Sequence, residues 1–262
     1  MKIKSKFPWI YLAVLTILMY IPILLTVIYS FNESKLTSVW EGFSLKWYVE
    51  LFRDDDMGEA LRNSLVLAVL SCLSAVVIGT TGAVGMQKRK SRMDRLVANM
   101  SLMPLMIPEI ILGMVFMAAF SFMDLPFGML TLVIAHTTFC VPYIFMTVRA
   151  RLAGTDPSIE EAARDLGANG VQIFCGITLP SIMPAILSGA LLSFAMSFDD
   201  VVISMFVTGA KVNTLPIKIY TRMKTGVTPE INALATVMLA VTVIVIFLAS
   251  LIQTISRRKK EV

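Results

Sequence analysis

Residues 161–180 read EAARDLGANGVQIFCGITLP, a polar stretch in a chain that otherwise consists largely of apolar runs. Asp156 and Pro157 precede it, and both residue types favour the start of a helix. Gly167 favours the end of that helix in a left-handed turn. The pattern predicts a short helix of about ten residues, which is marginal in water unless it packs against another surface.

Working outward, the composition places most of the chain in a membrane. Of 262 residues, 56% are hydrophobic and 16% are charged, whereas soluble domains carry about 25% charged residues. Apolar runs of about 20 residues can cross a hydrocarbon core of about 30 Å as helices. We expect six such spans, at about 8–30, 64–86, 96–122, 127–148, 183–207 and 232–255. The predicted fold class is an all-α membrane protein with one domain, residues 1–262, a core at about 60–255 and a loop at 149–181.

The positions of the basic residues predict the orientation, because cytoplasmic segments are enriched in Lys and Arg. With the N-terminus inside, the termini and the 87–95 and 149–181 loops hold 15 of the 23 Lys and Arg residues. The basic charge is then explained by topology and lipid contact, and no nucleic-acid partner is expected. The first apolar run is longer than the apolar part of a signal peptide, about 7–15 residues, so we expect a retained span.

Three isolated cysteines and one histidine offer no metal site. Cys72, Cys140 and Cys175 lack the spacing of a metal-binding motif and are expected to be packing thiols. His136 has no second histidine or carboxylate one helical turn away, so a packed or hydrogen-bonded role is favoured over a metal or proton-relay role.

Small and kinking residues give some detail within the spans. Ala75, Gly79 and Ala83 recur every four positions, which allows helix backbones to approach closely in lipid. Pro104, Pro108 and Pro142 remove helical hydrogen bonds and favour a bundle with a movable or water-lined interior. Aromatic residues between 40 and 52 alternate with charges and predict a short amphipathic helix on the outer surface, more as an interfacial cover than as a substrate contact.

The 149–181 loop has the features of a docking element. The methyl groups of Ala162 and Ala163 allow a partner surface to approach, and Leu166 offers an apolar side chain. A second short amphipathic piece follows Gly167, and Leu179-Pro180 is expected to end it before span five. These features alone are equally compatible with a loop helix that lies on the membrane surface.

The pattern Glu-Ala-Ala, three residues, Gly, nine residues, Ile-x-Leu-Pro resembles the EAA loop of permease subunits in bacterial ABC importers of type I. The resemblance implies a cytoplasmic coupling helix that sits in a cleft of a separate ATPase. It also implies a dimer of ATP-binding subunits, a second homologous permease subunit, an extracytoplasmic substrate-binding protein and a location in the bacterial inner membrane. The coupling residues are then Glu161, Ala162, Ala163, Leu166, Gly167, Ile177, Leu179 and Pro180.

The chain itself contains no Gly-x4-Gly-Lys-Ser/Thr loop to cradle phosphates. ATP and Mg²⁺ are therefore expected on the partner ATPase subunits, with no cofactor bound directly by this chain and no enzymatic activity of its own.

Acidic residues within or beside the spans suggest the substrate path, because buried carboxylates in a membrane are costly and attract cations. The candidates are Asp199, Asp200 and Glu109, with Phe198 as an aromatic face for a cation. Structural alternatives are a helix cap for the two aspartates, an internal ion pair for Glu109 and a lipid-facing or core position for Phe198. Asp124 is expected to be an exposed turn residue.

Further segments span nearly all of the chain: YIPI at 20–23, SFN at 30–32, KWY at 46–48, HTTFCVP at 136–142, SFDDVV at 197–202, LPIKIY at 215–220 and PEINALAT at 229–236. Together they resemble the polyamine branch of the family, the second permease subunits of spermidine/putrescine importers. That resemblance implies polyamine cargo and half of a translocation path. One departure is Glu109, where the branch has Asp after Pro, so the charge is kept and the side chain is longer.

Other functions remain as alternatives. Within the same family the cargo could be another organic cation or a metal–chelate. A secondary transporter or channel would need no ATPase partner. An intramembrane enzyme has little support, because no metal-binding histidine pair or serine motif with a placed base is present.

Overall fold

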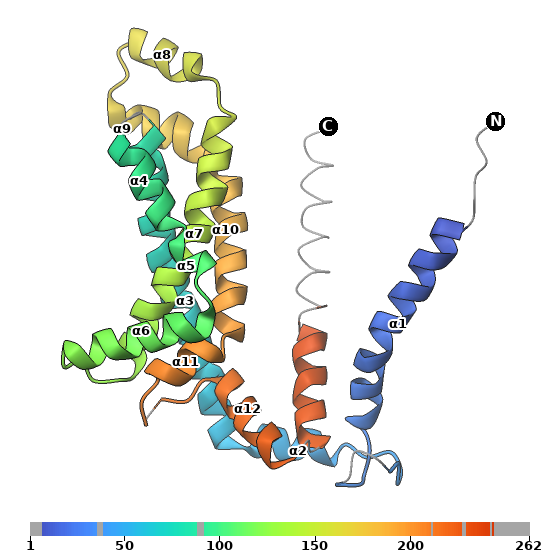
Figure 1. The fold of residues 1–262 in the computed structure, drawn as a ribbon. Coiled ribbons are helices and arrows are strands. Elements are labelled where there is room, and N and C mark those ends of the chain that lie inside the picture. The colour runs from blue at the N-terminus through green and yellow to red at the C-terminus, as the bar shows by residue number, and fades with distance from the viewer. Residues whose placement is uncertain are drawn as a thin grey trace. The chain divides into compact units, whose positions relative to one another are not determined.

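The computed structural model describes residues 7–35, 39–87, 92–210, 212–226, 229–241 and 243. These residues are almost entirely helical, and no strand forms among them beyond one isolated bridge between Asn32 and Phe43 (Figure 1). The chain divides into two compact units, Glu59–Lys218 and the combination of Met1–Gly58 with Ile219–Val262. The prediction of one domain with a core at about 60–255 stays a prediction.

The larger unit holds the two regions that the sequence singles out. Its helices, in chain order, are α3 (Asp55–Gln87), α4 (Arg92–Ser101), α5 (Met103–Met106), α6 (Glu109–Phe122), α7 (Met129–Ala153), α8 (Pro157–Asp165), α9 (Gly170–Ile173), the π-helical turn η1 (Phe174–Thr178), α10 (Leu179–Asp199), α11 (Val202–Val207) and α12 (Leu215–Thr225). The first residues of α3 and the last of α12 belong to the other unit.

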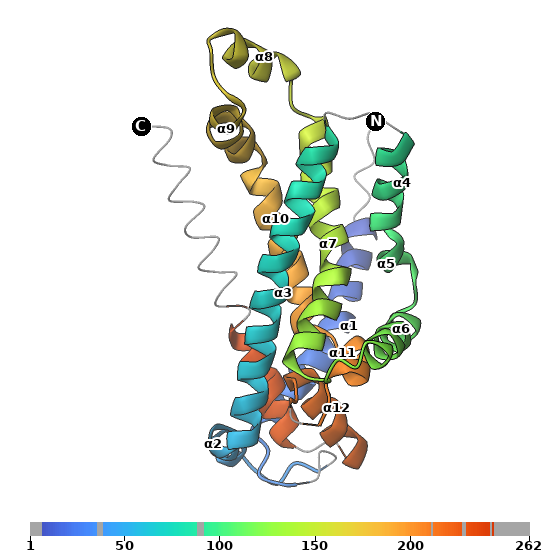
Figure 2. The same cartoon turned by 90° about the vertical axis from the view of Figure 1, so that its left-hand side faces the viewer.

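The core of the larger unit is formed by α3, α7 and α10, which pack against one another (Figure 2). Ile144 of α7 is fully buried, with Gly79 of α3 on one side and Gly189 of α10 on the other. A methyl group on Gly79 would lie 2.8 Å from Ile144 Cβ, and one on Gly189 would lie 3.2 Å from Ile144 Cα. Ala75 and Ala83 are buried beside Gly79, which confirms the close approach predicted from their spacing.

Within the described residues, four helices are long and apolar enough to cross a membrane: Trp9–Tyr29, Asp55–Gln87, Met129–Ala153 and Gly170–Asp199. They match the expected first, second, fourth and fifth spans. The expected sixth span begins in a shorter apolar helix, Pro229–Val241, and most of its remainder lies outside the described residues.

The expected third span, 96–122, is wrong as one continuous helix. It is divided into α4, α5 and α6, and α6 runs across the direction of α7 (Figure 1). Pro108 explains the second break, because a proline restricts the residue before it to extended conformations. Ile107 accordingly has φ −83° and ψ 130°.

The expected fifth span, 183–207, also differs from the structure. α10 ends at Asp199, Asp200 is extended, and α11 begins at Val202. Its start differs too, because Leu179-Pro180 does not end the preceding helix. The helix runs from Gly170 through η1 into α10. The wider π-helical turn gives room for the ring of Pro180, which in an α-helix would clash with the carbonyl of Gly176.

The smaller unit contains α1 (Phe7–Tyr29), α2 (Lys46–Arg53) and the start of the last apolar helix. The predicted amphipathic helix is confirmed as α2, with Trp47 and Leu51 buried. The Trp47 indole donates a hydrogen bond to the Asn32 carbonyl, 2.7 Å away. Arg222 of α12 forms ion pairs with Asp54 and Glu230, and so joins three segments of this unit.

Candidate functional site

The loop after α7 folds as its start and stop signals predict. Asp156 accepts a hydrogen bond from the backbone N–H of Ser158 at 3.0 Å, Pro157 begins α8, and Gly167 has φ +85°. The N–H of Ser158 also lowers the pKa of Asp156, because it stabilises the ionised carboxylate. The nine residues of α8 are therefore a capped helix that local sequence is sufficient to define.

One side-chain contact connects α8 to the helix that follows the loop. The hydroxyl of Thr178, at the end of η1, donates a hydrogen bond to Glu160 Oε1 at 2.8 Å. Arg164 lies 3.7 Å from the other oxygen of Glu160. A groove of about 500 Å³ lies between this contact and the end of α7, and Gln87 at the end of α3 also lines it. The polar side of α8 thus faces its own chain.

Three apolar residues of the loop are exposed. Leu166 is 89% exposed, Val171 73% and Ile159 56%. Ile159 lies on α8 and also lines the groove, Leu166 follows the end of α8, and Val171 lies on α9. Exposed apolar residues within one loop are typical of an interaction surface. The other predicted coupling residues lie around them: Glu161, Ala162, Gly167 and Pro180 are exposed, and Ala163, Ile177 and Leu179 are half-buried.

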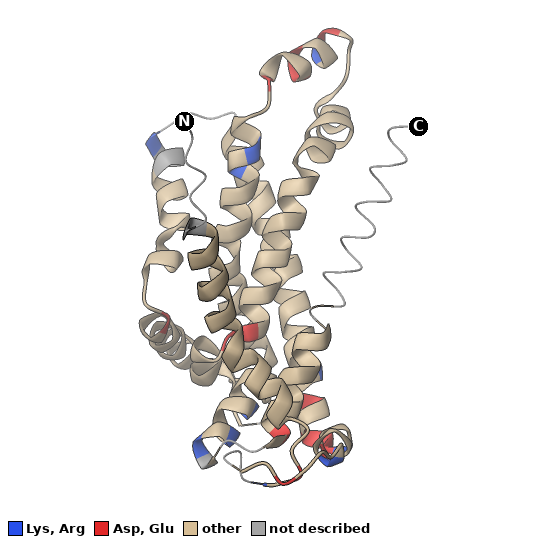
Figure 3. Cartoon of the chain, turned by 90° about the vertical axis from the view of Figure 1, so that its right-hand side faces the viewer, with Lys and Arg blue, Asp and Glu red and all other residues tan. Residues whose placement is uncertain are grey.

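The charged residues of the larger unit gather mainly at its two ends, separated by a long stretch of uncharged helix (Figure 3). α8 lies at one end, and α4 begins toward the same end (Figure 1). Gln87, the last described residue before the basic 88–92 stretch, lines the groove next to α8. The two loops predicted to share one side of the membrane are therefore at the same end of this unit.

A second hollow lies near the breaks in α10 and in the α4–α6 region. It is a cleft of about 480 Å³ that Glu109, Tyr143, Asp199 and Asp200 line together with apolar residues. Glu109 begins α6 and Asp199 ends α10, and both are exposed. The structure thus brings together three of the four predicted path residues, from helices far apart in the chain.

Phe198 is the predicted path residue that does not line this cleft. Its ring stacks on Phe194, with ring centroids 6.0 Å apart. Tyr143 and Phe139 line the cleft instead, and the sequence reasoning missed both. Their spacing of four residues places them on one face of α7, which was the signal available in the sequence.

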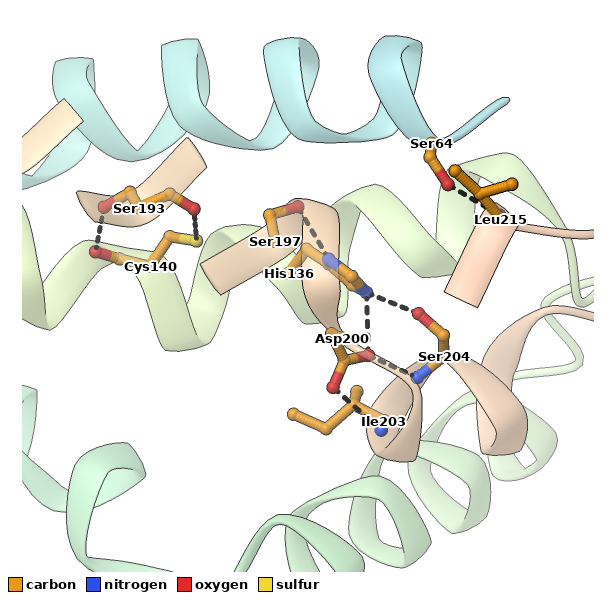
Figure 4. A network of polar contacts seen from close by, with 9 residues as sticks. All are labelled: Ser64, His136, Cys140, Ser193, Ser197, Asp200, Ile203, Ser204 and Leu215. Atoms are coloured by element: carbon orange, nitrogen blue, oxygen red, sulfur yellow. Dashed lines mark hydrogen bonds and ion pairs between the residues drawn. The ribbon is translucent and has the colours of Figure 1, made fainter. Parts of the chain in front are cut away.

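Asp200 differs from its neighbour Asp199, because its side chain is only 7% exposed and is fully engaged (Figure 4). Its two oxygens accept hydrogen bonds from the backbone N–H groups of Ile203 at 3.2 Å and Ser204 at 2.8 Å. The second oxygen also lies 3.4 Å from His136 Nε2. Asp200 therefore caps the start of α11, which is the helix-cap role named above as the alternative to a place in the substrate path.

His136 is fully buried and connects both sides of the break. Its Nδ1 is 2.8 Å from the hydroxyl of Ser197 on α10, and its Nε2 is 3.0 Å from the hydroxyl of Ser204 on α11 (Figure 4). The predicted hydrogen-bonded role of His136 is confirmed. Among the described residues, no group of three or more His, Cys, Asp or Glu could hold a metal ion.

Asp124 is an exposed turn residue with φ +51°, as expected. Of the cysteines, Cys72 and Cys140 are buried packing thiols, whereas Cys175 is exposed in η1.

Solved structures with this fold are bacterial ABC importers. A chain from the crystal structure of a transporter that imports the acidic polysaccharide alginate superimposes with a TM-score of 0.73 at 15% identity, covering 97% of this chain and 98% of that one. A chain of the alginate transporter in complex with a periplasmic protein bound to alginate pentasaccharide gives 0.72 at 18% identity, covering 94% and 93%. The fold is therefore that of a type I ABC importer transmembrane domain.

Sequence comparison identifies nearer relatives. The putrescine transport system permease protein PotI of Escherichia coli (strain K12) is 45% identical over 238 residues, which cover 88% of this chain and 85% of PotI. The spermidine/putrescine transport system permease protein PotC of the same strain is 40% identical over 234 residues, 89% of each protein. A family model described as the binding-protein-dependent transport system inner membrane component matches residues 75–262. The chain accordingly belongs to this family of multi-pass ABC importer permeases.

Proposed function

We propose that this chain is the permease subunit of an ATP-driven importer of polyamines, with putrescine or spermidine as cargo. The observation that carries the cargo assignment is the cleft in which Glu109 and Asp199 lie together with Tyr143. Exposed carboxylates can pair with the ammonium groups of a polyamine, and aromatic rings can contact its cations or methylene groups. The relatives that are 40–45% identical are putrescine and spermidine/putrescine permeases, which supports this choice.

Energy enters through α8 in this proposal. Leu166, Ile159 and Val171 form an exposed apolar surface, and the cleft of a separate ATPase subunit would cover it. A dimer of such ATPases, with ATP and Mg²⁺ bound to them, closes and moves α8. The exposed position of Ala162 suits this contact, because a methyl group allows close packing, and the exposed carboxylate of Glu161 is available to polar groups of the partner.

The remaining partners follow from the family. Half of the translocation path comes from this chain and half from a second homologous permease subunit, and an extracytoplasmic binding protein delivers the cargo. The termini and the α8 loop face the cytoplasm, in agreement with the 15 of 23 basic residues in these segments. Membrane lipid covers the exposed apolar surface of α1, in which none of the most apolar window is buried.

The test is ATP-dependent uptake of labelled putrescine and spermidine by vesicles that contain the complete complex. Asp199→Asn and Glu109→Gln remove charge with little change in shape, and each should lower uptake by about tenfold, since one ion pair to a charged group contributes about 1.5–3 kcal/mol. The control is Phe122→Leu, at a side chain that is 92% exposed at the end of α6.

Three results would count against the proposal. Normal uptake by both neutralised variants would remove the role of the cleft. Uptake without ATP would favour a secondary transporter. Transport of a metal–chelate or another organic cation, with no competition by polyamines, would keep the family and replace the cargo.

A further inference from the structure

We propose that His136 and Asp200 form a positioning pair, which fixes the break between α10 and α11 and so holds Asp199 at the cleft. This inference rests on the proposed function of Asp199 and assigns different roles to two carboxylates that are adjacent in the sequence. Asp199 contacts the cargo, whereas Asp200 and His136 act through it.

The break itself creates the need for such a pair. Where α10 ends, the first N–H groups of α11 have no partner within a helix, and an unpaired N–H away from water is costly. Asp200 supplies acceptors for two of them, on Ile203 and Ser204. The carboxylate that satisfies these groups is part of the backbone structure of the break.

His136 adds a fixed point on a third helix. The His136 ring lies on α7. Its Nδ1 contacts Ser197, which is about one turn before the end of α10. Its Nε2 contacts Asp200 and Ser204, which follow α10. The ring and both serine side chains are nearly or completely buried. A buried network of this kind permits few arrangements, because every group that loses its partner is left unpaired.

The geometry separates the two aspartates. Asp200 already accepts two backbone N–H bonds and lies beside the imidazole, so little of its carboxylate is available to a cargo. Asp199 is the last residue of α10, is exposed, and lines the cleft together with Glu109. The direction of its side chain depends on where α10 stops, and the His136–Asp200 pair sets that point.

The experiment is a double-mutant cycle measured as ATP-dependent putrescine uptake by the complete complex, normalised to the amount assembled. The variants are His136→Asn, Asp199→Asn and both together. If His136 acts through Asp199, each single change lowers uptake by about tenfold. The uptake of the double variant should then stay within about twofold of that of Asp199→Asn alone. A loss of uptake in the double variant equal to the product of the two single losses would overturn the proposal.

A conservative variant distinguishes the two sides of the ring. The amide of Gln reaches approximately the position of Nε2, whereas the amide of Asn reaches that of Nδ1. His136→Gln therefore keeps a donor toward Asp200 and Ser204 and should retain uptake within about threefold of the unchanged protein. Equal loss in His136→Gln and His136→Asn would contradict positioning through Asp200.

The matched control is Ser193→Ala, in the same interface between α7 and α10. Ser193 Oγ donates to the Cys140 carbonyl at 3.3 Å, away from the break (Figure 4). If Ser193→Ala lowers uptake, the double variant with Asp199→Asn should lose uptake by the product of the two single effects, because the two sites act independently. If His136→Asn fails to assemble, Asp200→Asn takes its place in the cycle, since asparagine keeps one acceptor for the N–H groups of α11 but loses the second acceptor and the charge beside His136. Normal uptake by Asp199→Asn would instead refute the cleft function itself.

Discussion

Thr178 connects α8 to the helix that leads into α10, and it does so with one hydroxyl group. The residue is buried, its hydroxyl donates to Glu160, and both residues line the groove beside α8. We therefore expect movement of α8 under a partner to be transmitted to η1 through this charge-assisted hydrogen bond. Such bonds are roughly twice as strong as those between neutral groups.

Replacement of Thr178 by Val keeps the shape and removes the donor. We expect about 1–2 kcal/mol less coupling between α8 and η1, and a fall of roughly fivefold or more in cargo imported per ATP hydrolysed. The measurement is paired uptake and ATP hydrolysis by the complete complex. Thr155→Val is the control, because the Thr155 hydroxyl bonds to the Leu152 carbonyl within its own helix end. An unchanged import ratio in Thr178→Val would contradict this role.

For single residues, local features could be predicted from the sequence, whereas contacts between residues far apart in the chain could not. Asp156 and Gly167 act on neighbouring backbone, so residue type and spacing were sufficient to place them. Asp200 was expected in the substrate path, but its helix-capping role depends on Ser204 and on His136. His136 contacts Ser197 and Ser204, 61 and 68 residues further along the chain, and only the packing of α7 on α10 brings them together.

At the scale of elements, close packing of small residues holds the larger unit together. The Ala75-Gly79-Ala83 spacing predicted this contact because it depends on one helix face alone. The break in the fifth span was missed, and that in the third was expected only as proline kinks, since apolar composition does not show where a helix stops. Pro108 was recognised as a kinking residue, but its effect on Ile107 and the new direction of α6 depend on backbone geometry.

Gly79→Ala should destabilise the assembled complex. The added Cβ would lie 2.8 Å from Ile144 Cβ and 3.1 Å from the backbone nitrogen of Phe145, so α3 or α7 must shift. Overpacking of this kind costs about 1–3 kcal/mol. Thermal unfolding of the complex in detergent measures the effect.

Gly85→Ala is the matched control, because it lies on the same helix and nothing is within 4 Å of the added Cβ. Alanine is favoured over glycine in a helix interior by about 1 kcal/mol, so this variant should be neutral or more stable. Equal destabilisation of both variants would show that the α3–α7 contact is looser than the structure indicates.

At the scale of the whole chain, the distribution of basic residues predicts which way the helices cross the membrane. The start of α4 and the end of α7, which carry Arg92, Arg149 and Arg151, lie toward the same end of the larger unit as α8. A single orientation therefore satisfies both the cytoplasmic enrichment of Lys and Arg and access of an ATPase to α8. The opposite orientation would place α8 outside the cell, where no ATP-driven partner could reach it.

The three native cysteines test this orientation without engineered probes. Cys175 is exposed in η1 next to the α8 loop, whereas Cys72 and Cys140 are buried. A membrane-impermeant maleimide should label the chain in inside-out vesicles and leave it unlabelled in right-side-out vesicles, because a thiol reacts only where reagent and water reach it. Cys175→Ser should abolish the labelling, since the buried thiols cannot replace it. Labelling of Cys175 from the outer side would reverse the predicted topology and remove α8 from contact with any cytoplasmic ATPase.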